Sequence, residues 1–351
     1  MCDLIKQPLV DRLPTEILAH VLVLYANDAF ERRTKERHFT QWQSDIVYAL
    51  RKGKSPYVFL DVTRRWRAVT LSCPGFWSNI VVGPRRKVKL LLERSGNCAL
   101  YVFCLASDTE GHDTSDTRHA VLKLTLEHLH RIRSLQLIVR ARDAGLEPCA
   151  LYDTATAPLL GSLSIFFVED TSQMHENIRK NPIRSIGAKW IAPRLLRLRT
   201  HGGSDRSTTL NNFVPLQLKD TLTHLVWLPA HSFPPRTPFS CAEDVLLVLK
   251  SLQHLETLHI GFAKELADDL SASQVTCAKL PYPRRLLLEG NVDICLGVLE
   301  RLEFPELLQQ FGVLVRRTSR RNDGMVQLTD FLIDFAQSQD WLSPNVPVRQ
   351  F

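Results

Sequence analysis

The sequence predicts an α+β protein, in which a small all-helical module at the N-terminus precedes a curved, leucine-rich α/β body with largely parallel strands. Two observations predict this architecture. Apolar residues recur at helical spacing over 13–25 and 57–73. The pattern L-x-x-L-x-L, which is typical of one strand of a solenoid coil, recurs through the rest of the chain. With 351 residues, the chain has room for one small module and one larger domain.

The first predicted helix lies in Leu13–Tyr25, which reads LPTEILAHVLVLY. Pro14 suits a first helical turn, where its missing N–H is no loss, and Glu16 is favourably placed against the helix dipole. Apolar residues follow at a spacing that gives a wide stripe. We therefore expect this helix to contact other groups on more than one side.

The second predicted helix lies in Tyr57–Cys73, which reads YVFLDVTRRWRAVTLSC. Its apolar residues recur at steps of four, four, three and four, and form one face. Pro74-Gly75 ends the helix, and SNIVV follows as a first strand. The stripe consists of Val58, Val62, Trp66, Val69 and Cys73.

An insert at 26–56 separates the two helices. Its first part, ERRTKERH, is charged and expected to be solvated, and its second part, QWQSDIVYAL, predicts a short helix. We therefore expect a helical module at 8–82, a body at 83–351, and a capping helix near 326–338.

The order and chemistry of residues 13–80 resemble an F-box, the short helical domain of ubiquitin-ligase adaptors. The start LPTEIL, the later VTRRWRAVTLS and the closing FWSNI carry the resemblance. It is closest to fungal-type F-box proteins, although Thr63 stands where cysteine is frequent and the insert lengthens the module. The matching residues are Val62, Arg64, Arg65, Trp66, Arg67, Pro74, Trp77, Ser78 and Ile80.

The resemblance implies a partner for the module. In this family it docks on the Skp-type adaptor of cullin-RING ligases. Residues that would serve only as internal core include Leu22 and Val69. The contact surface implied by the resemblance consists of Leu13, Pro14, Ile17, Leu18, Val62 and Trp66.

The body shows a weak internal repeat. Measured at the middle leucine, successive copies from Leu135 to Leu286 are 28, 35, 27, 33 and 28 residues apart, which is irregular. Helical segments are predicted between the strands, so the order is that of a curved α/β solenoid. The clear copies are Ile132/Leu135/Leu137, Leu160/Leu163/Ile165, Leu222/Leu225/Trp227 and Leu255/Leu258/Ile260, with degenerate copies at Leu100/Val102, Leu195/Leu198 and Leu286/Leu288.

The composition and the start of the chain indicate an intracellular protein, cytoplasmic and/or nuclear. The first ten residues lack the features of a signal peptide, and no apolar stretch is long enough for a membrane span. The eight cysteines form no C-x-x-C pair and are expected to be reduced. The net charge of +7 hints at acidic partners, but aromatic residues do not alternate with the basic residues through the clusters, Trp66 being an isolated case, so nucleic-acid binding is not expected.

The sequence contains no catalytic signature. It has no G-x-S-x-G, H-E-x-x-H, P-loop or G-x-G-x-x-G pattern, and it predicts neither a cofactor nor a metal site. We therefore expect a protein that is not an enzyme.

Two functions remain open. The favoured one is a non-catalytic adaptor that links a target protein to a cullin-RING (SCF-type) ligase. The alternative is a leucine-rich-repeat binding or scaffold protein with no ubiquitin role, in which the F-box-like segment is an N-terminal cap. Outward strand positions, which alternate with the leucines, are the candidate target contacts. They include Gln136, Arg197, Arg199, His224, Thr257 and His259.

Overall fold

The computed structural model describes residues 12–34, 56–105, 115–140, 156–168, 190–201, 220–228, 242–262, 277–303, 308–315, 326 and 328–333. The protein is mixed α/β with a large parallel sheet, which confirms the predicted mixture of helices and largely parallel strands. The chain divides into two compact units, Met1–Leu137 and Ile138–Phe351, which we term the N-terminal and C-terminal units. This division does not coincide with the boundary near residue 82 that the sequence indicated.

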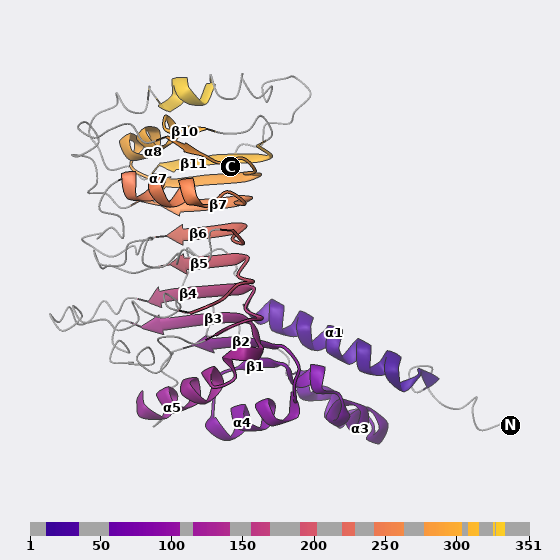
Figure 1. Ribbon diagram of the computed structural model, residues 1–351. Coiled ribbons are helices and arrows are strands. Elements are labelled where there is room, and N and C mark those ends of the chain that lie inside the picture. The colour runs from indigo at the N-terminus through magenta and orange to yellow at the C-terminus, as the bar shows by residue number, and fades with distance from the viewer. Residues whose placement is uncertain are drawn as a thin grey trace. The chain divides into compact units, whose positions relative to one another are not determined.

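The N-terminal unit joins helices to strands (Figure 1). Its elements are α1 (Thr15–Thr34), the 3-10 turns η3 (Pro56–Asp61) and η4 (Pro74–Trp77), α3 (Arg64–Ser72), β1 (Asn79–Val81), α4 (Arg85–Arg94), β2 (Leu100–Leu105), α5 (Ser115–Leu126), η5 (Leu129–Arg131) and β3 (Ile132–Arg140). The first strand occurs where SNIVV predicted it, and β1 pairs with β2 in parallel.

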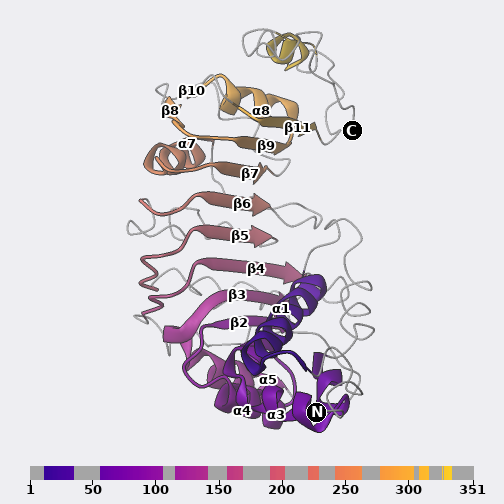
Figure 2. The ribbon, with the colours of Figure 1, turned by 90° about the vertical axis from the view of Figure 1, so that its right-hand side faces the viewer.

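Within the described residues, the C-terminal unit has six strands of one parallel sheet, in the order β4-β5-β6-β7-β9-β11, whose arrows run in one direction (Figure 2). These are β4 (Ser162–Val168), β5 (Arg197–His201), β6 (His224–Leu228), β7 (Thr257–Gly261), β9 (Arg285–Gly290) and β11 (Gln310–Val315). The remaining elements are α7 (Ala242–Ser251), α8 (Val292–Leu299) and the short parallel pair β8 (Ala278–Lys279) and β10 (Leu302–Glu303).

The repeated leucines form one continuous row across five of these strands. Strand pairing places Leu163 beside Leu198, then Leu225, Leu258 and Leu286 in turn. All five side chains are buried. Because side chains alternate between the faces of a strand, this row defines the core face of the sheet. The sequence predicts that Leu135, Leu163, Leu225 and Leu258 share a buried side. This is confirmed for Leu163, Leu225 and Leu258, and Leu135 is buried in β3 of the N-terminal unit.

The starts of the strands repeat one hydrogen-bonding arrangement. The carbonyl immediately before each of β4, β5, β6, β7 and β9 accepts bonds from two successive N–H groups at the start of the neighbouring strand, at 2.7–3.0 Å. Such paired donors fix where the neighbouring strand begins. The five accepting carbonyls belong to Gly161, Leu196, Thr223, Glu256 and Arg284.

Several helices differ in extent from the sequence-based expectation. Helix α1 runs on to Thr34, well past Tyr25. Helices α7 and α8 lie between strands, as the sequence predicts for its helical segments, and Asn291 is the N-cap of α8, its side chain accepting a bond from Asp293 N. The capping helix is described at 326 and 328–333, and Leu328 is buried there. The middle helix expected in QWQSDIVYAL and the charged segment at 35–38 lie outside the described residues.

We predict that truncating Leu225 to Ala lowers the free energy of unfolding by about 2–5 kcal/mol, because the substitution leaves a cavity in a packed core. Val226 is half-buried on the opposite face of the same strand, so Val226→Ala should cost less than about 1 kcal/mol. Urea unfolding of both variants checks this. Equal losses of unfolding free energy in the two variants would show that Leu225 does not lie on the core face and Val226 on the surface face of β6.

Candidate functional site

Helix α1 carries two apolar faces. Leu18, Leu22 and Ala26 are buried against the rest of the N-terminal unit, with Leu18 and Leu22 at 0% exposure. Ile17, Val21 and Leu24 are spaced i, i+4, i+7 and are 51%, 43% and 54% exposed. At 100° per residue this second set falls in one row beside the buried one. The wide stripe therefore divides into a covered and an uncovered part, and we term Ile17, Val21 and Leu24 the α1 exposed row.

The start of α1 is fixed by an arginine of the next helix. The Arg65 guanidinium donates a hydrogen bond to the Leu13 carbonyl oxygen, 52 residues away in sequence. Leu13 is half-buried and Pro14 is exposed at this point. Because Val62 lies three residues before Arg65 and is 50% exposed, the bond brings the two parts of the predicted contact surface to the same end of α1.

The predicted second helix is interrupted, which corrects the sequence-based expectation of one helix over 57–73. The chain forms η3, then a turn, and α3 begins only at Arg64. Thr63 is the N-cap of α3, and its side chain accepts a hydrogen bond from Trp66 N at 3.1 Å. A capping threonine has extended backbone angles, so Val58 and Val62 cannot continue the helical face of Trp66 and Val69. Both valines are exposed.

Aromatic side chains hold the short elements of this unit together. Tyr25 of α1 packs edge-on against Phe59, with ring centroids 4.7 Å apart, and Phe59 packs on Trp66 at 5.4 Å. Trp77 stacks on Tyr57 at 5.8 Å and donates a hydrogen bond from Nε1 to the Thr70 carbonyl at 2.9 Å. The closing Phe-Trp pair of the signature is thus buried core.

The structure separates the six predicted docking residues into two groups. Pro14, Ile17 and Val62 are exposed, and Leu13 is half-buried. Leu18 and Trp66 are buried, so their side chains are already covered by this chain. Sequence reasoning missed Val21 and Leu24, although their spacing from Ile17 was visible, and it missed the contact that Arg65 makes with the start of α1.

The C-terminal unit brings three of the predicted target-facing residues into one row. Arg197, His224 and Thr257 are the first residues of β5, β6 and β7 and are paired in register, and Arg285 of β9 continues the row. We term these four residues the strand-start row. None of them belongs to the buried core.

Arg199 and His259 lie in a second row on the same face, separated by Val226. His259 Nε2 lies 3.7 Å from a carboxylate oxygen of Glu289. Gln136 lies in β3 and is half-buried. It therefore belongs to a different strand group from the other five predicted contacts.

His224 reports the charge around the strand-start row. Burial and the positive charges of Arg197, Arg285 and Arg199 lower the pKa of its imidazole, while Glu256 acts in the opposite direction. The effect of Arg197 exceeds that of Glu256. His224 Nδ1 lies 2.8 Å from Thr223 Oγ1, and Thr223 Oγ1 donates to the Leu196 carbonyl at 3.1 Å.

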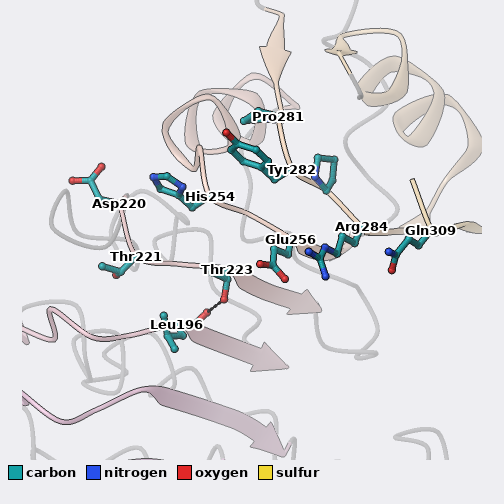
Figure 3. Close-up of a pocket in the computed structure, with 11 residues that line it drawn as sticks. Leu196, Asp220, Thr221, Thr223, His254, Glu256, Pro281, Tyr282, Arg284 and Gln309 are labelled. Carbon is teal, nitrogen blue, oxygen red and sulfur yellow. Dashed lines mark hydrogen bonds between the residues drawn. The ribbon is translucent and has the colours of Figure 1, made fainter. Parts of the chain in front are cut away.

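A pocket of about 810 Å³ opens at the starts of these strands. Figure 3 shows its lining, including the bond from Thr223 to the Leu196 carbonyl. The rings of His254 and Tyr282 lie parallel at 6.4 Å on one side of it. Four of the residues around it immediately precede the strand-start row, so the pocket and the row adjoin along the chain. These are Leu196, Thr223, Glu256 and Arg284.

Neither metal nor membrane chemistry is indicated within the described ranges. No group of three or more potential metal-ligating side chains gathers among those residues. None of the described helices combines the length and apolarity needed to cross a membrane. Burial raises the pKa of the Cys295 thiol to about 12, so this cysteine is protonated at neutral pH.

Comparison of the chain with protein-family models, with curated proteins and with solved structures gives no match.

We predict that Thr63→Ala destabilises the protein by about 1 kcal/mol, because it leaves a helix N–H of α3 without its capping oxygen. Thr63→Ser keeps an oxygen acceptor and should retain most of the stability. Urea unfolding measures both variants. Equal destabilisation by Ala and Ser would mean that the threonine methyl group, and not the cap, contributes the stability.

We predict that His224 makes the folded state less stable as the pH falls. Its pKa is lowered on folding from the ordinary value of 6.5, so the unfolded chain binds the proton more readily below that pH. The free energy of unfolding of the wild type, relative to that of His224→Gln, should therefore decrease as the pH is lowered from 7.5 to 5.5. Urea unfolding at each pH measures this difference. A difference that is constant with pH would contradict a lowered pKa.

Proposed function

We propose that this protein is a non-catalytic adaptor that binds a Skp-type adaptor protein through its N-terminal unit and recruits a target protein to a cullin-RING ligase. In this role the chain supplies position, by raising the local concentration of the target near the ubiquitin-transfer site. It makes and breaks no bonds itself and needs no cofactor. The role belongs to the inside of the cell, in the cytoplasm and/or the nucleus.

The observation that carries the proposal is the α1 exposed row. Helix α1 already buries one apolar face in its own unit and still exposes Ile17, Val21 and Leu24. Each side chain of this size contributes roughly 1.5–3 kcal/mol when a partner buries it fully, before the cost of association. An apolar helix row of this spacing suits helix-in-groove recognition by a partner protein.

The F-box resemblance identifies the partner that we propose. The exposed residues Pro14 and Ile17 stand at positions that the resemblance implies for adaptor contact, and Val62 is exposed as well. Leu18 and Trp66 would support this surface from beneath, since both are buried. The proposed docking surface therefore consists of Pro14, Ile17, Val21, Leu24 and Val62.

For the body, we propose a curved leucine-rich solenoid with helices on its convex side. The continuous leucine row and the five repeated carbonyl arrangements support this, because both recur once per coil despite unequal spacing in the sequence. A solenoid of this kind presents one strand face to a partner. The strand-start row lies on the face opposite the leucines.

One observation favours a second function, a scaffold protein with no ubiquitin role. Asn79 of β1 donates a hydrogen bond to Asn27 of α1 at 2.7 Å, and Leu18 and Leu22 are core residues. Helix α1 is thus well integrated in the N-terminal unit, as a cap would be. The experiment that follows separates the two functions.

We predict that Ile17→Asp with Val21→Asp weakens binding to the Skp-type adaptor by more than about a hundredfold. Two carboxylates would then enter a desolvated interface, at a cost of several kcal/mol, and each 1.4 kcal/mol is tenfold in affinity. Biolayer interferometry with the intact chain measures the affinity. Because both side chains are exposed, far-UV circular dichroism should not change.

The matched control is Leu90→Asp, which charges an apolar side chain of similar exposure on α4 and should leave binding unchanged. If the Ile17/Val21 variant binds the adaptor as tightly as the wild type, the docking surface does not include these residues and must lie elsewhere on the protein. If the intact wild type does not bind the adaptor at all, the scaffold function is the better one.

A further inference from the structure

We infer that the strand-start row of the C-terminal unit binds a short, extended, acidic segment of a partner protein, whose carboxylates lie about four residues apart. This inference rests on the proposed recruiting role and names the chemistry of the target that the body would hold. It is carried by the placement of Arg197 and Arg285 on the exposed face of the sheet.

The two arginines are exposed and stand at the ends of the row. Neither forms an ion pair with a carboxylate among the described residues. His224 and Thr257 lie between them in register, and both offer polar side chains. At His224, between the two arginines, the effect of Arg197 exceeds that of Glu256 and Arg285 acts in the same direction, which fits the positive charge that the two exposed guanidinium groups place at the ends of the row. Charge complementarity therefore selects an acidic ligand.

The length of the row sets the spacing of the ligand's charges. Strand β5 is separated from β9 by three strand-to-strand steps. At about 4.8 Å a step, Arg197 and Arg285 arise roughly 14 Å apart. An extended peptide rises about 3.3 Å a residue, so 14 Å corresponds to about four residues. Carboxylates at positions i and i+4 of an extended segment match the two guanidinium groups.

The surroundings favour a peptide over a nucleic acid. Glu256 and Asp220 lie at the same edge of the sheet, so the positive charge is confined to the short row and does not continue as the long basic track that a phosphate backbone requires. The only ring within the row is the half-buried imidazole of His224, whose Nδ1 lies against Thr223 Oγ1, so the row offers no series of exposed rings on which successive bases could stack. The adjoining pocket beside Tyr282 and His254 instead offers a place for an apolar side chain that flanks the acidic positions.

The test measures fluorescence anisotropy of labelled decapeptides with the full-length protein at 50 mM salt. One peptide carries Glu at positions 3 and 7 in an alanine-serine background with one leucine. A second has the same composition but adjacent Glu residues. We expect the spaced peptide to bind more tightly, and Arg197→Gln or Arg285→Gln to weaken it about two- to fivefold each. The double variant should lose about tenfold.

Two variants sharpen the result. Arg85→Gln with Arg86→Gln removes the same charge from exposed positions on α4 and should leave peptide binding unchanged. Arg197→Lys with Arg285→Lys keeps the charge and should restore most of the affinity. Circular dichroism of the double Gln variant, whose changed side chains are exposed, confirms that it folds.

Three outcomes would overturn the inference. These are equal binding of the spaced and adjacent peptides, equal loss in the α4 control, and tighter binding of a labelled single-stranded oligonucleotide that depends on the same arginines. The Arg197/Arg285 variant should still bind the Skp-type adaptor. Failure of adaptor docking in the wild type would leave the peptide result standing, so the two proposals fail separately.

Discussion

Parallel pairing in a single register is the constraint on which the C-terminal unit depends. Strands β5, β6, β7, β9 and β11 each start where two successive N–H groups meet one carbonyl that precedes the neighbouring strand, and the accepting carbonyls run from Gly161 to Arg284. Because the register is the same at every step, leucines separated by unequal lengths of chain align into one buried row. A slip of one residue would turn that row to the opposite face and expose it. The charged row on the other face follows from the same register.

In the N-terminal unit, α1 packs on α3, η3 and η4, and Tyr25 of α1 joins an aromatic cluster with Phe59 and Trp66. Leu18 and Leu22 are buried, so one apolar face of the helix is already covered within the unit. The other face has no equivalent cover among the described residues. The contact between Arg65 and the Leu13 carbonyl then fixes the helix start, so the exposed row is presented on a positioned element.

Much of the strand pattern could be predicted from the sequence, because a period of two in Leu, Ile and Trp depends only on local alternation. Strand β11 was missed, since FGVLV does not repeat the L-x-x-L-x-L pattern. Helix α4 was missed although Val88, Leu91 and Leu92 follow helical spacing, because its start is crowded with charge. The division of α1 into buried and exposed apolar residues could be predicted only in part. Periodicity identifies an apolar side chain such as Leu18 or Ile17, but the tertiary contacts decide which one the chain covers itself.

The paired N–H arrangement has a consequence for how the body tolerates change. Main-chain atoms define the starts of the strands, so the residues at positions 197, 224 and 285 can be substituted without loss of these hydrogen bonds. Residues inserted between the end of one strand and the start of the next also leave the bonds intact, which fits the unequal spacing of the leucines. Proline is the exception at any of the ten donor positions, because it removes the N–H itself. Substitutions along this edge can therefore change what the surface binds, while the backbone hydrogen bonds that position the strands stay the same.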